Sequence, residues 1–194
     1  MLFRSKSRAL ELAKLSDRPG GEGVKLTPLK RELVKVTLDA AGRKAEIVVQ
    51  GPTGKQPKTG AEALAKGADW WPLQMARELD DAILDLRHNQ REIGLWMLKT
   101  RGDIAAMLEM DAMLEANAKH WFVRETIGLL RRTFSRLDVS SRSLFALIEE
   151  GSCFAGTFLE LALACDRSYH LALPDDAAAA PKITVGDVNF GLYQ

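Results

Sequence analysis

The chain has 194 residues and a net charge of +1, and 46% of its residues are hydrophobic and 27% charged, a composition typical of an ordinary globular protein with a buried core. No apolar run approaches the roughly 20 residues that a membrane-spanning helix needs, and the basic N-terminus lacks the apolar block of a secretory signal. We therefore expect one cytoplasmic domain, or part of one, without membrane association.

The distribution of charge bears on possible binding partners, and the cysteine content bears on disulfide and metal sites. Residues 1–60 hold 13 Lys and Arg against 6 Asp and Glu, and the remainder holds 14 against 20. The basic first third could meet the phosphates of coenzyme A or of nucleic acid, but a solvated face is the simpler interpretation. Cys153 and Cys165 form neither the pattern of a disulfide framework nor that of a metal site.

The first third predicts a helix, a linker and a hairpin. Residues 7–15 have helical spacing and stop at the Pro- and Gly-containing cluster 16–21, so we expect the closing helix of a preceding unit there. Residues 32–38 alternate with period two, a turn follows, and residues 45–49 alternate again, which predicts a β-hairpin. Residues 51–60 are polar and predict an exposed loop.

The middle of the chain predicts helices around one buried strand. Trp70-Trp71-Pro72 opens an amphipathic helix over 73–86, and we expect the two indoles to anchor it in the core rather than to stack on a ligand. His88 is expected in a solvated turn. The apolar run 93–98 predicts a strand, a helix follows through Leu108 and Met113, and 121–136 predicts a long helix that His120 could help to cap.

Residues 143–166 are the segment around which the rest is organised. An apolar run at 143–148 predicts a buried strand, a glycine-containing turn follows, and residues 157–165 predict an apolar helix. Beyond Asp166, residues 168–173 predict a strand, 174–180 a loop and 183–185 a further short strand.

A tight turn between strand and helix leaves backbone N–H groups without intrahelical partners. Such amides can form an oxyanion hole, and Gly156 would let a ligand approach the main chain closely. Glu160 is the only charge inside the following helix, and a carboxylate buried there would have a raised pKa suited to proton transfer at neutral pH.

The residues from Gly156 onward, read as Gly-x-x-x-Glu-Leu-Ala-Leu-Ala-Cys-Asp, resemble the signature of the crotonase (enoyl-CoA hydratase/isomerase) superfamily. The resemblance implies an α/β fold of the crotonase type, a spiral of ββα repeats, here incomplete. It also implies that the turn donates an N–H to a thioester oxygen and that Glu160 is one of two acid/base carboxylates. Asp187 stands at the position of the second carboxylate with a shorter side chain, and Gly102 and Asp103 match the other oxyanion turn, whose loop is contracted.

A closer resemblance is to the benzoyl-CoA-dihydrodiol lyase family, also called 2,3-epoxybenzoyl-CoA dihydrolases. Its members contain two crotonase-like halves, and this chain is similar to the start of the second, which implies a fragment with residues 1–25 closing the preceding domain and residues 26–194 forming a partial crotonase-like domain. The segments that carry the resemblance are 70–73, 76–84, 120–126, 140–149, 151–157 and 188–193.

The family resemblance implies a C–C lyase of aerobic benzoate degradation, which converts 2,3-epoxybenzoyl-CoA to a semialdehyde acyl-CoA plus formate. Coenzyme A would enter as part of the substrate, with no covalently bound cofactor and no metal. The implied partners are an aromatic acyl-CoA thioester and the missing halves of the same enzyme, and a homo-oligomer stays open.

Three functions remain open on the sequence: a part of this ring-opening lyase, a non-catalytic scaffold half of it, and a generic enoyl-CoA hydratase or isomerase. The isolated chain is expected to be inactive in the first two. By their match to crotonase superfamily positions, Glu160 and Asp187 are the candidate catalytic residues. Gly102, Gly156 and Thr157 are the candidate oxyanion and CoA-binding residues.

Overall fold

The structure is a computed structural model that describes residues 31–174, 176 and 180–193. The expected helix at 7–15, the linker after it and most of the proposed boundary between residues 1–25 and 26–194 lie outside the described residues. Within them the chain forms a mixed α/β fold with a five-stranded sheet, so the α/β prediction is confirmed.

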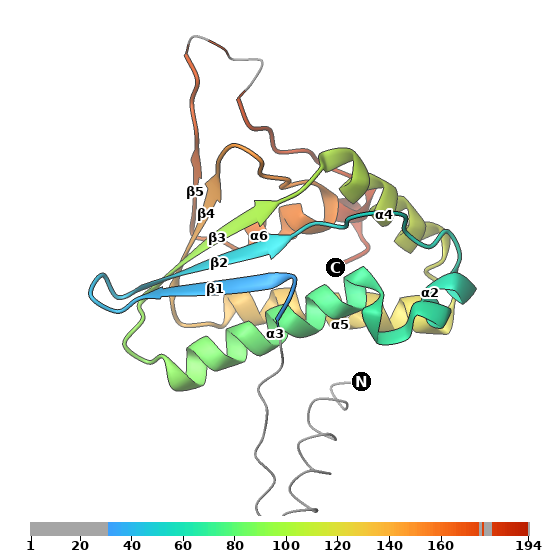
Figure 1. The fold of residues 1–194 in the computed structure, drawn as a ribbon, viewed down its shortest axis with the longest axis horizontal. Helices are drawn as coiled ribbons and strands as arrows, with labels where there is room; N and C mark the ends of the chain where they lie inside the picture. The colour runs from blue at the N-terminus through green and yellow to red at the C-terminus, as the bar shows by residue number, and fades with distance from the viewer. Residues whose placement is uncertain (1–30, 175, 177–179, 194) are drawn as a thin grey trace, which may run out of the picture. The chain divides into compact units, whose positions relative to one another are not determined.

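The sheet follows the order of the chain, β1-β2-β3-β4-β5. The first pair is antiparallel, as the predicted hairpin requires, and the other three pairs are parallel (Figure 1). Parallel neighbours need crossover connections, and helices supply them here. The strands are β1 (Val34–Asp39), β2 (Lys44–Gln50), β3 (Leu95–Arg101), β4 (Ser143–Ile148) and β5 (Arg167–His170).

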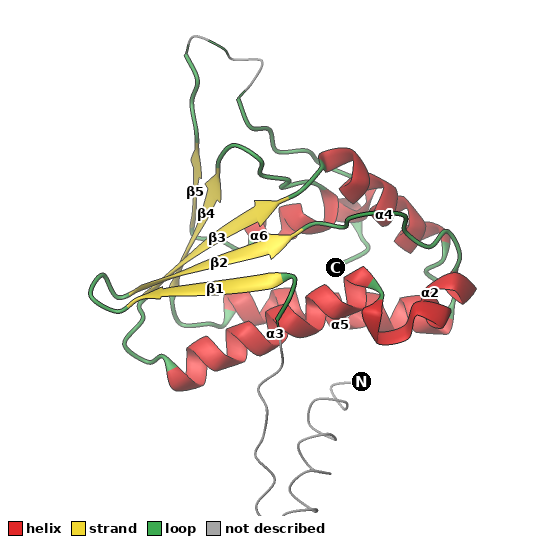
Figure 2. Ribbon diagram, viewed as in Figure 1, coloured by secondary structure: helices red, strands yellow, loops and turns green. Residues whose placement is uncertain are grey.

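The helices gather mainly on one side of the sheet, where α3 and α5 run beside each other (Figure 2). The short helix α2 was not predicted; Thr59 caps it by accepting the N–H of Glu62 at 3.2 Å. The helical elements are α2 (Gly60–Lys66), η1 (Gly67–Asp69), α3 (Trp71–Asn89), α4 (Ile104–Ala116), α5 (Trp121–Asp138), η2 (Gly156–Phe158), α6 (Leu159–Leu163) and η3 (Asp187–Phe190).

Alternation along the strands builds the core. In β3 every second residue is buried, and Trp96 and Leu98 are fully so. The tryptophan pair at the start of α3 is buried as predicted, and Trp71 Nε1 donates to the carbonyl of Gln50 at 3.0 Å. These contacts fix α3 against the end of β2, so the indoles serve the core and not a ligand.

Two strands predicted at the C-terminal end are shorter than expected: the first forms as β5 and the second does not form a strand. The strand expected at 168–173 ends at His170, and Leu171 keeps only one further bond, from its N–H to the carbonyl of Ile148 at 2.9 Å. The strand expected at 183–185 is a single bridge between Ala155 and Thr184. β5 ends where its partner β4 ends, since His170 pairs with Ile148, the last residue of β4, and no further β4 residue continues the ladder.

Candidate functional site

The strand–turn–helix unit at 143–166 forms, and β4 spans the predicted residues 143–148. The predicted helix over 157–165, however, is a 3₁₀ turn, η2, followed by the one-turn helix α6, which ends at Leu163. The helix stops early because Asp166 returns to β4, where its N–H donates to the Leu144 carbonyl at 2.9 Å and its Oδ2 accepts the Leu144 N–H at 2.8 Å.

The amides of the three predicted oxyanion residues all have acceptors within the chain. Gly102 N–H donates to the carbonyl of Gly151 at 3.2 Å, and Gly156 N–H donates to the carbonyl of Thr184 at 3.1 Å. Thr157 N–H donates to Oδ2 of Asp111 at 2.9 Å. A ligand oxygen could reach any of these amides only by replacing the internal acceptor.

The two predicted acid/base carboxylates occupy different environments. Glu160 is half-buried rather than buried as expected, and its Oε1 accepts from Nδ2 of Asn189 at 2.6 Å. It lines a pocket of about 210 Å³ together with Tyr193 and residues of α5. Asp187 is exposed at the start of η3 and is not among the residues that line that pocket.

Asn189 explains why Glu160 faces an amide instead of a substrate. Its Nδ2 donates both to Glu160 and to the carbonyl of Gly156, the latter at 2.9 Å, and its Oδ1 accepts the N–H of Gly186 at 2.9 Å. All the polar atoms of this side chain are therefore used, and they hold η3 against the β4–α6 turn.

A buried network centred on Asp111 was not predicted. Asp111 lies on α4 and is only 3% exposed, and besides the Thr157 amide it is hydrogen-bonded to Thr157 Oγ1. Thr157 Oγ1 is in turn 2.6 Å from the hydroxyl of Tyr193, whose ring packs edge-on against Phe134. The network thus joins α4, η2 and the C-terminal segment.

Burial dominates the electrostatics of this network. It raises the pKa of Asp111 from 3.8 to about 7, although both hydrogen bonds from Thr157 act to lower it. Burial, and then the charge of Asp111, also raise the pKa of Tyr193 well above its ordinary value. A carboxyl group that titrates near neutrality can hold or release a proton there, but it is enclosed by the chain's own hydroxyls.

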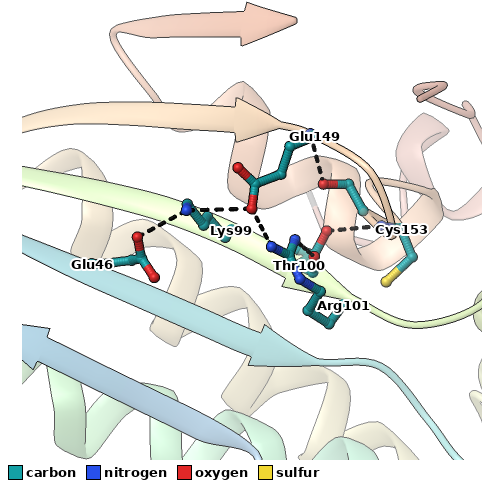
Figure 3. A network of polar contacts seen from close by, with 7 residues as sticks. Glu46, Lys99, Thr100, Arg101, Glu149 and Cys153 are labelled. Atoms are coloured by element: carbon teal, nitrogen blue, oxygen red, sulfur yellow. Dashed lines mark hydrogen bonds and ion pairs between the residues drawn. The ribbon is translucent and has the colours of Figure 1, made fainter. Parts of the chain in front are cut away.

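A second polar network crosses the sheet from Glu46 within β2 to the C-terminal ends of β3 and β4 (Figure 3). Lys99 Nζ lies 2.8 Å from a carboxylate oxygen of Glu46 and 3.3 Å from one of Glu149, and Arg101 pairs with the same oxygen of Glu149. The hydrogen bond to Glu46, more than any other contact, raises the pKa of Lys99. Two acids and two bases alternate in this ladder, so its charges cancel.

The cysteines behave as packed side chains. Cys153 is buried and its N–H donates to Thr100 Oγ1 at 2.9 Å, while Cys165 is half-buried. Burial raises the pKa of the Cys153 thiol to about 11 and that of Cys165 to about 12, so neither thiol is set up as a nucleophile at neutral pH.

Two of the three histidines, His88 and His120, lie at the ends of helices. His88 is exposed in the last turn of α3 rather than in the turn after it. His120 occupies the N-cap position of α5 but makes no side-chain capping bond, and its ring lies over Gly60. In the part of the chain that the structure describes, no group of three or more His, Cys, Asp or Glu side chains could hold a metal ion, and no helix combines the length and hydropathy needed to cross a bilayer.

No family model matches the chain. Among solved structures, an enoyl-CoA hydratase from Geobacillus kaustophilus has a TM-score of 0.47 at 20% identity and covers 77% of this chain and 52% of its own. The protein DspI from Pseudomonas aeruginosa has a TM-score of 0.49 at 19% identity, covering 81% and 54%.

The sequence comparison is more specific. The chain is 54% identical over 198 aligned residues, 97% of its length, to the benzoyl-CoA-dihydrodiol lyase of Aromatoleum evansii. The match covers 35% of that protein, so the chain spans about a third of the length of this relative. The chain is therefore similar in sequence to one part of that benzoyl-CoA-dihydrodiol lyase.

Proposed function

We propose that this chain forms part of an enzyme that opens the ring of an aromatic CoA thioester, and that it is a supporting rather than a catalytic part. The observation that carries the proposal is the 54% identity over 97% of the chain to a protein named as a lyase of benzoyl-CoA dihydrodiol. Its partners are then the remainder of such an enzyme and a substrate that contains coenzyme A.

The supporting role rests on the hydrogen bonds of the turn. An oxyanion hole works through N–H groups that are oriented in advance and free to meet the charge that develops on the substrate. The amides of Gly102, Gly156 and Thr157 each have an acceptor within the chain. Their role as oxyanion donors stays a prediction, and it requires each amide to exchange that acceptor for a ligand.

The alternative is a local active site of the hydratase or isomerase kind, with Glu160 and Asp187 moving protons. Two carboxylates that share a substrate must both lie within hydrogen-bond reach of it, directly or through one water. Glu160 lines the pocket beside α5, whereas Asp187 is exposed elsewhere on η3. This geometry favours the supporting role.

The proposal is tested by a chimera. The segment of the Aromatoleum evansii lyase that aligns with this chain is replaced by these residues, and lyase turnover is measured. We expect the chimera to fold and to retain activity within about tenfold of the parent, because a supporting segment must reproduce packing and not reacting groups. A folded chimera with no turnover would contradict the assignment to this enzyme.

The same chimera separates the supporting from the catalytic role. Glu160→Gln and Asp187→Asn are each introduced, with Glu115→Gln on an exposed part of α4 as the matched control. We expect all three variants to keep kcat within a few-fold of the chimera, because in a supporting role none of these side chains transfers a proton. Removing a general acid or base would instead lower kcat by about 100-fold or more. A loss of that size for Glu160→Gln or Asp187→Asn, and not for the control, establishes the catalytic alternative.

A further inference from the structure

The C-terminal strap, defined here as residues 186–193, is fastened to the β4–α6 turn at separate points. Asn189 holds the carbonyl of Gly156 and the carboxylate of Glu160. Val188 is buried, and Tyr193 reaches Thr157 Oγ1 through its hydroxyl. In contrast, Phe190 between these points is 78% exposed. The strap is therefore held by these polar anchors together with apolar contacts of Val188, Leu192 and the Tyr193 ring.

Because Gly156 has no side chain, it leaves space for Asp111 of α4 and for Val188 of the strap. Its φ of +47° is a conformation that side-chain-bearing residues rarely adopt. A Cβ atom here would overlap Oδ2 of Asp111 and lie 3.4 Å from Cγ2 of Val188. The carboxyl group of Asp111 on α4 thus occupies the space that a side chain at position 156 would fill, and Val188 of the strap lies next to it.

We propose that Asp111 is a positioning residue which, through Thr157 and Tyr193, couples its own protonation to the attachment of the strap. The proposal rests on contacts within this chain and is independent of the proposed function. Its test uses the isolated chain, and no substrate is required.

The network accommodates both protonation states without moving heavy atoms. When Asp111 is ionised, Thr157 Oγ1–H donates to the carboxylate and the Tyr193 hydroxyl donates to Thr157. When Asp111 is neutral, its own O–H can donate to Thr157, and the Thr157 hydroxyl then donates to Tyr193. Either atom of the Thr157–Tyr193 pair can be the donor at 2.6 Å, so the direction of the chain of bonds follows the proton.

The charges around the network determine which state the attached strap favours. The titratable groups around it are Glu115 on α4, Glu160 on α6 and Tyr193 of the strap: the charge of Glu115 raises the pKa of Asp111, and the charges of Asp111, Glu160 and Glu115 raise that of Tyr193. Burial raises the pKa of Asp111 to about 7, and release of the strap would open one side of the carboxyl group to water and lower this pKa toward 3.8. The attached state therefore binds the proton more tightly than the released state, and attachment weakens as pH rises from about 4 to 7.

Amide hydrogen exchange followed by mass spectrometry measures this directly. Peptides that cover 186–193 are compared between pH 5 and pH 8 after correction for the intrinsic exchange rate, with β2 and β3 as internal references. We expect protection of the strap to fall about tenfold or more as pH rises, because one unit of pKa difference corresponds to a tenfold change in equilibrium. The reference strands exchange through unfolding of the whole domain and therefore also lose protection as Asp111 ionises, but their protection should exceed that of the strap at both pH values.

Variants distinguish a proton-linked strap from ordinary packing. Asp111→Asn keeps the shape of the neutral acid and should hold the strap equally at both pH values, while Glu115→Gln, the matched control, should keep the wild-type profile with a slightly lower midpoint. Tyr193→Phe keeps the ring on Phe134 but removes the hydroxyl, and should reduce strap protection. The proposal is overturned if Asp111→Asn retains the wild-type pH profile, if Tyr193→Phe exchanges like wild type, or if the strap is protected to the same extent as the reference strands, which would mean that only unfolding of the whole domain exposes it.

Discussion

Glu149 and Asp111 are both acids that contact the β4–α6 unit, but their neighbours differ in charge. Burial acts to raise the pKa of Glu149, yet hydrogen bonds from Arg101 and Lys99 and the charges of those side chains outweigh it, and the pKa lies below its ordinary value. Asp111 has only hydroxyl and amide donors and an acidic neighbour, and its pKa is raised to about 7. Burial and the charge of the partners together decide the sign of the shift: burial prevails for Asp111, and two cationic partners prevail for the more exposed Glu149.

This difference separates the two regions by function. The ladder on the sheet joins neighbouring strands through opposite charges. The Asp111 network changes its protonation within the physiological range and joins elements that are distant in sequence, with Asp111 and Thr157 46 positions apart. The ladder therefore links strands by charge pairing, whereas the Asp111 network can respond to a change in pH.

The largest expected effect is the pH dependence of stability contributed by Asp111. Because its folded-state pKa is raised, the native state binds more protons than the unfolded state between 3.8 and about 7, so stability is greatest below this window and is lost as pH rises through it. The full contribution is at most about 4 kcal/mol. Urea denaturation at pH 5, 6, 7 and 8 measures it.

Asp111→Asn supplies the comparison for that measurement. The amide cannot ionise, so we expect a nearly flat profile and, at pH 8, a variant more stable than wild type, since it keeps the hydrogen-bond geometry without a buried charge. If the variant instead shows the wild-type slope, the carboxyl of Asp111 is not the titrating group, and the contrast between the two regions fails.

A second, smaller effect is expected from Gly156→Ala. The alanine must adopt a φ of +47° and its Cβ overlaps Asp111, so we expect a loss of about 3 kcal/mol in the free energy of unfolding. Gly54→Ala is the matched control, because Gly54 has a φ of +64° with nothing within 4 Å, and it should lose only about 1 kcal/mol.

The clash component of that loss can be isolated with a double-mutant cycle. In an Asp111→Ala background the carboxyl group is gone, and Gly156→Ala should cost at least about 1 kcal/mol less than in wild type. Equal costs in both backgrounds would mean that backbone conformation alone explains the glycine, and that Asp111 does not occupy its space.

Local pattern was sufficient for the elements that bury one regular face. The strand at 143–148 was predicted to the residue because an apolar run is bounded there by polar residues and a glycine turn, and the hairpin and α5 follow from alternation and helical spacing. The helix after Gly156 was predicted too long, because its end is determined by Asp166 pairing with Leu144 across the turn. Propensity carries no information on such a contact.

The site could be predicted less well from the sequence, because its contacts also join residues that lie far apart in the chain. Glu160 was expected to be buried since its neighbours are apolar, but its environment depends on Asn189, which lies 29 positions later. Asp111 did leave a signal, as a single acid among the buried residues Met107, Met110 and Leu114 of α4. A buried acid on an apolar helix face requires a partner, and only the fold identifies Thr157 as that partner.

The smallest expected effect lies in the ladder and tests the other side of the comparison. Glu149→Gln removes the acid shared by Lys99 and Arg101, and because these side chains are partly exposed we expect a loss of only about 0.5–1 kcal/mol at low salt, decreasing as salt screens the pairs. Since the pKa of Glu149 is lowered, this contribution is present above its ordinary value of 4.5 and is lost as pH falls below it, opposite in sign to Asp111. Glu92→Gln, which removes the exposed partner of Arg43, should have no measurable effect and serves as the control. A loss for Glu149→Gln that is independent of salt would show that packing, and not charge pairing, joins these strands.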